Sequence, residues 1–219
     1  MIPFQWRFKN PEAPQVLVLG AHCDDIPIGC GGTLLRLYKA YPSAEILWVV
    51  LTGADERVKE ERSVVAKLLP GARVELVICQ DWRDGFLPTQ AIAVKEFFES
   101  LKRRLSPDLI FTHFERDRHQ DHRLVSELTW NTFRHHMILE YEIPKYDGDI
   151  GSPNVFMPLS ADECSEKLRT VLQGYPSQQS KHWFDEELFR GLARLRGAEA
   201  GSGVSYAEGF YARKLVLKP

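Results

Sequence analysis

Cysteine is scarce in this chain of 219 residues, and its placement excludes several kinds of site. The four cysteines form no Cys-x-x-Cys pair, which argues against a zinc ribbon and against a redox dithiol. A reduced intracellular chain is the simplest interpretation of so few thiols. No apolar run approaches the length of a membrane span, and the first residues contain no apolar core of a signal peptide. We therefore expect a cytoplasmic protein without a membrane span.

The chain also lacks a large excess of positive or negative charge. The formal net charge is -2 and no block of Lys and Arg stands out, so we expect no nucleic-acid partner. Apolar residues make up 44% and charged residues 26%, which is typical of a globular domain. The length suits a single α/β domain. We expect residues 1–219 to form one domain, with a core over 1–145 and an appendage over 146–219. The sequence leaves homo-oligomerisation open.

Strand-like and helix-like segments alternate over the first 145 residues. Short apolar segments predict five strands, at 15–20, 45–51, 73–79, 108–112 and 137–143. Helical spacing predicts four helices between them, at 33–41, 55–69, 90–105 and 123–133. This alternation indicates a Rossmann-like three-layer α/β/α fold with a mainly parallel sheet. The glycines before residue 33 are expected to allow a tight turn and close helix packing.

The pattern becomes less regular after residue 145. We expect a long loop at 146–153, helices at 161–172 and 185–196, and an edge strand at 210–217.

Two polar clusters follow predicted strands. Ala21-His22-Cys23-Asp24-Asp25 comes after the first strand, and a second cluster over 112–123 comes at the end of the fourth. In a doubly wound sheet of order 3-2-1-4-5, the first and fourth strands are neighbours and the winding direction reverses between them. Ligands bind in the crevice at such a point. The two clusters are therefore expected to form one site.

The residue types of these clusters suit a catalytic zinc ion. Such an ion commonly has three protein ligands and one position open for water, and His22, Asp25 and His122 can supply the three. Fe²⁺ is an alternative, since His and Asp ligands accept both metals. Asp24 is placed to take a proton from water, and His119, with Asp121 as its partner, is placed to stabilise an oxyanion or protonate a leaving group.

These motifs carry a family resemblance. The chain resembles the PIG-L/LmbE-like zinc de-N-acetylases, whose first motif is Ala-His-Pro-Asp-Asp with a following Gly-Gly-Thr and whose second is His-x-Asp-His. The resemblance implies metal ligands at His22, Asp25 and His122. It also implies a catalytic Asp24, and a transition-state histidine at His119 with its partner Asp121. It further implies an N-acetylated sugar conjugate as the small-molecule substrate, with Arg57 and Asp84 facing it.

The resemblance has two departures. Cys23 stands where the family has proline, and Ile26-Pro27 stands where acidic residues are often found. Neither change removes a proposed ligand or the base. A thiol beside the metal would be sensitive to oxidation, and the missing acidic residues bear on substrate choice.

Alternative interpretations are available for the individual residues and for the whole chain. Arg57 can belong to a solvated helix face, and Asp84-Gly85 is a common turn. The glycines at 29, 31 and 32 do not complete a dinucleotide fingerprint, because Leu34 occupies the third glycine position. The leading function is a zinc-dependent deacetylase. A zinc-dependent hydratase of an unsaturated dicarboxylic acid and a non-catalytic binding module are the alternatives.

Overall fold

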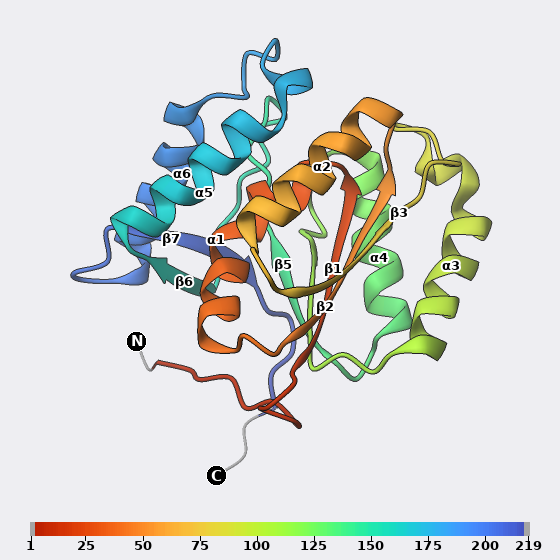
Figure 1. The fold of residues 1–219 in the computed structure, drawn as a ribbon, viewed down its shortest axis with the longest axis horizontal. Coiled ribbons are helices and arrows are strands. Elements are labelled where there is room, and N and C mark those ends of the chain that lie inside the picture. Colours follow the sequence, from red (N-terminus) through yellow and green to blue (C-terminus); the bar gives the residue numbers. More distant parts are fainter. Residues whose placement is uncertain (1–2, 217–219) are drawn as a thin grey trace.

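The computed structural model describes residues 3–216, which form a seven-stranded sheet of order β3-β2-β1-β4-β5-β7-β6 (Figure 1). Five of its strands are parallel: β1 (Gln15–His22), β2 (Glu45–Thr52), β3 (Arg73–Ile78), β4 (Leu109–His113) and β5 (Met137–Tyr141). The predicted α/β fold and the order 3-2-1-4-5 are therefore confirmed. Beyond β5 the sheet continues with two antiparallel strands, β7 (Tyr206–Tyr211) and β6 (Val155–Leu159).

Helices cover both faces of the sheet, because successive strand residues point to opposite sides. On β1, Val16 and Val18 pack into one apolar layer, and Leu17 and Leu19 pack into the other. The first layer is covered by α1 (Asp25–Ala40), α2 (Asp55–Leu68), α5 (Ala161–Gly174) and α6 (Glu186–Ala200). The second layer is covered by α3 (Ala91–Arg104) and α4 (Gln120–Thr132) (Figure 1). None of the helices formed by residues 3–216 has both the length and the apolar character needed to cross a bilayer.

Helix α1 begins earlier than its sequence predicts. The segment before residue 33 is helical from Asp25 onward instead of forming a turn, and the helix is interrupted at Cys30, where φ is -141°. The Glu208 carboxylate of β7 accepts the backbone N–H groups of Gly32 at 2.8 Å and Thr33 at 2.6 Å. These bonds cap the second half of the helix, as a carboxylate at a helix N-terminus does.

The glycines of α1 allow close packing. A Cβ atom added to Gly29 would lie 2.2 Å from the Tyr141 ring of β5, and one added to Gly32 would lie 2.6 Å from Leu159 of β6. A larger side chain at either position would push the helix off the sheet. The expected close packing is therefore confirmed, whereas the expected tight turn is wrong, because this segment is helical with an interruption at Cys30.

The end of the chain also differs from its prediction. The strand expected at the sheet edge over 210–217 is β7, and it lies between β5 and β6. Residue 217 of the expected strand lies outside the described residues. The sequence analysis missed β6, a short strand that contains Pro158. Proline lacks the N–H that an inner strand needs, which fits the position of β6 at the edge.

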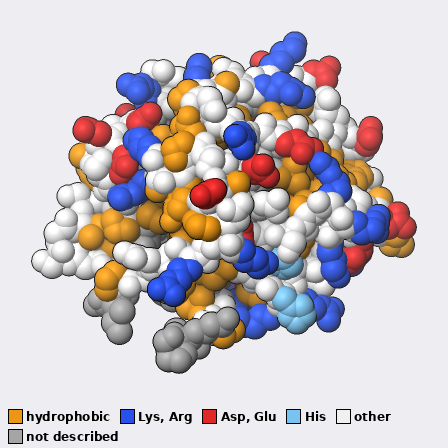
Figure 2. Space-filling view, turned by 60° about the horizontal axis from the view of Figure 1, so that its bottom comes forward, with side chains coloured by type: hydrophobic (Ala, Val, Ile, Leu, Met, Phe, Trp, Pro, Cys, Tyr) orange, Lys and Arg blue, Asp and Glu red, His pale blue; other side chains and the backbone are white. Residues whose placement is uncertain are grey.

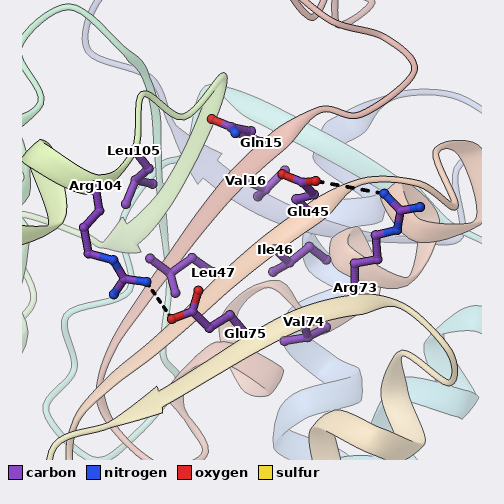
Figure 3. A pocket seen from close by; sticks show the side chains of 10 residues that line it. All are labelled: Gln15, Val16, Glu45, Ile46, Leu47, Arg73, Val74, Glu75, Arg104 and Leu105. Atoms are coloured by element: carbon purple, nitrogen blue, oxygen red, sulfur yellow. Dashed lines mark hydrogen bonds and ion pairs between the residues drawn. The ribbon is translucent and has the colours of Figure 1, made fainter.

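The amino ends of the parallel strands form the face that Figure 2 turns toward the reader. Basic, acidic and apolar side chains are interspersed over it. A hollow of about 620 Å³ lies at the start of β1, β2 and β3 (Figure 3). Ion pairs cross it between Glu75 and Arg104 at 2.7 Å and between Glu45 and Arg73 at 4.0 Å. No histidine, cysteine or aspartate lines this hollow, whereas all three residue types gather at the opposite ends of the strands.

Candidate functional site

The two polar clusters meet at the carboxyl ends of β1 and β4. These strands are adjacent and parallel, with three consecutive residues of each paired in register. His22 is the last residue of β1, and His119 immediately precedes α4, the helix that follows β4. Asp25, His22 and His122 are all buried there. The structure therefore brings together the residues that the sequence predicted to converge.

The side chains of His22, Asp25 and His122 approach one another as the ligands of a tetrahedral metal do. His22 Nδ1 lies 3.2 Å from His122 Nε2 and 3.4 Å from Asp25 Oδ2. His122 Nε2 lies 3.4 Å from Asp25 Oδ1. Bonds of about 2.0–2.1 Å at tetrahedral angles separate two zinc ligand atoms by roughly 3.3 Å. Each nitrogen faces a different oxygen of Asp25, and the distances and donor types suit zinc held by the two imidazoles and this carboxylate.

Neighbouring side chains form other possible triads. His22 and His122 also group with His119, Asp25 and His122 with His113, and His22 with Asp84 and Asp121. The lone pair of His113 Nε2 already accepts the Ala21 backbone N–H at 3.0 Å. The Asp121 carboxylate likewise already accepts the backbone N–H groups of Gly85 and Leu87. These hydrogen bonds argue against the sets that contain His113 and Asp121.

Asp121 contacts a different partner from the one predicted. Its carboxylate accepts the backbone N–H groups of Gly85 at 2.7 Å and Leu87 at 3.1 Å, and its Oδ2 lies 3.1 Å from His22 Nε2. The bond between Asp121 and His119 runs instead from the Asp121 backbone N–H to His119 Nδ1 at 3.3 Å. The expected pairing is thus corrected: the Asp121 carboxylate orients His22, because its backbone is held at the start of α4.

Asp117 orients the other histidine of the triad, and the sequence analysis missed it. Its Oδ2 accepts a hydrogen bond from His122 Nδ1 at 2.8 Å, which leaves Nε2 free to face the triad. Lys145 Nζ lies 2.9 Å from the same oxygen and 2.8 Å from Asp149. Burial opposes ionisation of Asp117, but the His122 and Lys145 contacts outweigh it and hold its pKa well below the usual range. Carboxylates in this position fix the tautomer of a metal-binding histidine.

Asp24 lies between His22 and Asp25 in the sequence, but its carboxylate contacts Arg57. Its Oδ1 accepts a hydrogen bond from Arg57 Nη2 at 2.7 Å. Burial raises the pKa of Asp24 to about 6, an effect that Arg57 opposes and the Asp25 charge reinforces. A carboxyl group with a pKa near 6 can exchange protons near neutrality.

His119 is held as a neutral imidazole. Burial, together with the charges of His122 and His22, lowers its pKa to about 4. Because Nδ1 accepts the Asp121 backbone N–H, the ring proton of the neutral form lies on Nε2. The His119 ring lies 4.7 Å from the His22 ring, measured between centroids. His119 therefore offers an N–H donor beside the triad.

The two predicted substrate residues lie on a cavity of about 320 Å³ that adjoins His22. Arg57 is partly buried there, and its Nε has no hydrogen-bond partner among residues 3–216. Asp84 is more exposed, and its Oδ1 lies 3.1 Å from His22 Nε2. That hydrogen bond lowers the pKa of Asp84 to about 2 against the opposing effect of burial. Gly85 adopts a φ of 81°, which a tight turn at this position requires.

Cys23 points away from the triad. Its buried Sγ lies 3.7 Å from the Thr52 carbonyl oxygen and also packs near Gly53. Burial and the nearby Glu61 charge raise the pKa of the thiol well above its usual value. A thiol held in its protonated form is a poor metal ligand and a poor nucleophile.

A profile of the PIG-L family, described as GlcNAc-PI de-N-acetylase, matches residues 17–133 of this chain. YaiS of Escherichia coli (strain K12), described as an uncharacterized deacetylase, is 30% identical over 166 residues, which are 71% of this chain and 85% of YaiS.

Two solved structures share the fold. The conserved protein TT1542 from Thermus thermophilus is 26% identical with a TM-score of 0.72, covering 93% of this chain and 96% of that one. The N,N'-diacetylchitobiose deacetylase from Pyrococcus horikoshii is 23% identical with a TM-score of 0.69, covering 94% of this chain and 87% of that one. At 23% identity, the similarity to the Pyrococcus horikoshii protein is evidence for the fold alone.

Proposed function

Because this chain belongs to the PIG-L family of de-N-acetylases, we propose that it is a zinc-dependent hydrolase that removes the acetyl group from an N-acetylglucosamine-type sugar conjugate. The observation that carries the proposal is the geometry of His22, Asp25 and His122: the two imidazole nitrogens lie 3.2 Å apart, and each lies 3.4 Å from one of the two Asp25 oxygens. That spacing suits tetrahedral zinc, and a base and a hydrogen-bond donor lie beside it. Zinc, when bound, would supply Lewis acidity that polarises a carbonyl and lowers the pKa of water.

Asp24 is the proposed general base. Its carboxylate lies next to the ligands without being part of the closest triad, and its pKa near 6 suits transfer of a proton from the attacking water. The protonated Asp24 can then deliver that proton to the leaving amine, which would otherwise depart as an unstable anion. Arg57, 2.7 Å away, holds this carboxylate in place.

His119 is the proposed hydrogen-bond donor to the developing oxyanion. Its Nε2 carries the ring proton when its Nδ1 accepts a backbone N–H, and its low pKa keeps it neutral. A donor of this kind acts by stabilising the negative charge that forms on the carbonyl oxygen. Asp121 supports the reaction indirectly, by fixing the orientation of His22.

The adjoining cavity supports a sugar-sized substrate. Its volume of about 320 Å³ exceeds that of one hexose ring, and Arg57, Gln80 and Asp84 offer donors and acceptors for hydroxyl groups. Trp82 adds an aromatic surface to the same lining. Small-molecule sites are commonly concave and combine apolar surface with a few polar groups.

The test uses zinc-loaded protein with N-acetylglucosamine and N,N'-diacetylchitobiose, and measures the release of primary amine and acetate. Asp24→Asn should lower kcat by roughly 10²-fold or more while zinc content stays at the wild-type level. Asp81→Asn, which removes an exposed carboxylate nearby, is the matched control and should keep wild-type activity. Full activity of zinc-loaded Asp24→Asn would contradict the assignment of the base.

A hydratase would use the same metal and base on a different substrate. The two functions separate when an unsaturated dicarboxylic acid is added in a parallel assay and its enoate absorbance is followed. Loss of that absorbance without release of amine from any acetylated sugar would replace the deacetylase proposal. Metal analysis after reconstitution would distinguish zinc from Fe²⁺, and absence of either would favour a binding module.

A further inference from the structure

Asp24 has an unusual backbone. Its φ is 98°, and it is the one non-glycine residue with a positive φ between residues 3 and 216. A side chain in this region meets its own backbone, so the conformation persists only where surrounding contacts impose it. Asp24 occupies the turn between β1 and α1, where the chain passes from one metal-site residue to the next. The contacts that hold this turn therefore bear on where its carboxylate points.

Two residues of α2 hold the peptide group that precedes the Asp24 α-carbon. Arg57 Nη2 donates a short hydrogen bond to the Cys23 carbonyl oxygen. The Asp24 N–H on the other side of the same peptide donates to Glu61 Oε2 at 3.3 Å. Arg57 and Glu61 are four residues apart, so they project from the same side of the helix. Rotation of this peptide would break one bond or the other.

Glu61 is itself fixed by two further donors. It is fully buried, and its Oε1 accepts a hydrogen bond from Trp48 Nε1 of β2 at 2.7 Å. The Tyr175 hydroxyl, just after α5, donates a short hydrogen bond to Oε2. Trp48 and Tyr175 are also fully buried. The carboxylate of Glu61, on α2, is thus held in place by Trp48 of β2 and by Tyr175 after α5.

We propose that Glu61 is a positioning residue that, with Trp48 and Tyr175, fixes the Cys23–Asp24 peptide and so directs the Asp24 carboxylate into the site. The consequence for catalysis rests on the proposed function, whereas the structural role does not. In a regular strand, adjacent side chains point to opposite faces. At the end of β1 this alternation stops: the turn at Asp24 leaves its carboxylate on Arg57, while the next carboxylate, Asp25, lies 3.4 Å from His22 Nδ1. Tyr175 lies beyond residues 17–133, the part that the family profile matches.

The neighbouring Glu60 provides a matched control. Its carboxylate accepts the Ser177 backbone N–H at 2.8 Å and the Ser177 hydroxyl at 2.6 Å. Both glutamates therefore tie α2 to the segment after α5, but only Glu61 also reaches Asp24. A variant of Glu60 shows the effect of weakening the contact between α2 and the segment after α5 while the hydrogen bond of Glu61 to Asp24 is kept.

The structural experiment needs no substrate. Crystal structures and amide hydrogen exchange are compared for wild type, Glu61→Leu and Glu60→Gln. We expect Asp24 to leave the positive-φ region and its amide to exchange at least about tenfold faster in Glu61→Leu, because a bond that protected it is gone. Glu60→Gln should keep the wild-type φ and exchange rate. If Glu61→Leu does not fold, Tyr175→Phe removes one donor to Glu61 and should raise Asp24 amide exchange roughly threefold. Unchanged Asp24 exchange in the folded variant overturns the proposal.

The catalytic experiment measures kcat, KM and zinc content of the same variants. Glu61→Leu should lower kcat by roughly 10²-fold through misplacement of the base, with KM and zinc content within about twofold of wild type. Glu61→Gln keeps an acceptor oxygen for Asp24 and should recover at least tenfold of that loss. A fall in zinc content equal to the fall in kcat, or an equal loss in Glu60→Gln, contradicts a role through Asp24. If wild type turns over no acetylated sugar, the proposed function fails, and the structural experiment still decides the positioning role.

Discussion

Replacement of Asp117 should weaken zinc binding although Asp117 is outside the proposed ligand triad. Its carboxylate accepts His122 Nδ1 at 2.8 Å, Lys145 Nζ at 2.9 Å and the His119 backbone N–H at 2.7 Å. Without it, the His122 ring loses the bond that fixes its tautomer and its orientation. Loss of such a partner typically costs about 10- to 100-fold in metal affinity.

The size of the loss should depend on what remains at position 117. Asp117→Ala removes both the acceptor and the charge, so we expect a loss near the upper end, roughly 100-fold or about 2.7 kcal/mol. Asp117→Asn keeps an oxygen that accepts from His122, so a loss of roughly tenfold is expected. Asp149→Asn is the matched control: Asp149 contacts Lys145 and the Arg118 backbone N–H, but no triad residue.

The assay is competition for zinc against a chromophoric chelator at fixed pH and ionic strength. Wild type, Asp117→Ala, Asp117→Asn and Asp149→Asn are compared, with circular dichroism as a check on folding. The expected order of zinc affinity is wild type and Asp149→Asn, then Asp117→Asn, then Asp117→Ala. A Kd for Asp117→Ala within twofold of wild type would refute the reasoning, as would an equal loss in Asp149→Asn.

Three further predictions concern the metal-free protein. Asp24→Gly should be roughly 1 kcal/mol more stable than Asp24→Ala in urea unfolding, because glycine accepts the φ of 98° without strain; equal stability would contradict a strained backbone. Burial raises the pKa of Glu61 to about 7 from a reference value of 4.5, so the unfolded state releases this proton first and stability falls as pH rises through that window. The free energy of unfolding should fall by up to about 1.4 kcal/mol per pH unit in wild type and should depend less on pH in Glu61→Gln. The same pH dependence in Glu61→Gln as in wild type would exclude Glu61 as its source. Gly29→Ala should destabilise by roughly 1–3 kcal/mol, since its Cβ would lie 2.2 Å from Tyr141, whereas Gly191→Ala in open space should stabilise slightly; equal melting temperatures would argue against that close packing.

The sequence predicted the parallel part of the sheet because its strands are short and mostly apolar and are separated by segments of helical periodicity. That alternation also placed the two polar clusters at one edge, since parallel neighbours end together. Residues that act over long sequence separations were missed. Glu61 contacts Tyr175 across 114 positions, and Lys145 contacts Asp117 across 28, and neither belongs to a repeating pattern.

Local patterns also misled where one residue serves two segments. The glycines before residue 33 predicted close packing, which Gly29 provides for the Tyr141 ring, and a tight turn, which is absent. In place of the turn is a broken helix that Glu208 caps from the far end of the chain. Asp121 was assigned to His119 by proximity in sequence, whereas its carboxylate faces His22. Asp117 offered the one usable signal, a carboxylate two residues before His119 in the same loop.

The most direct test of the central claim is anomalous diffraction at the zinc edge from crystals of the zinc-loaded protein. We predict one zinc ion bound by His22 Nδ1, the Asp25 carboxylate and His122 Nε2 at about 2.0–2.1 Å, with the Asp24 carboxylate beside the ion and not bonded to it. Zinc held by Asp24, or by another of the neighbouring triads, would contradict the account.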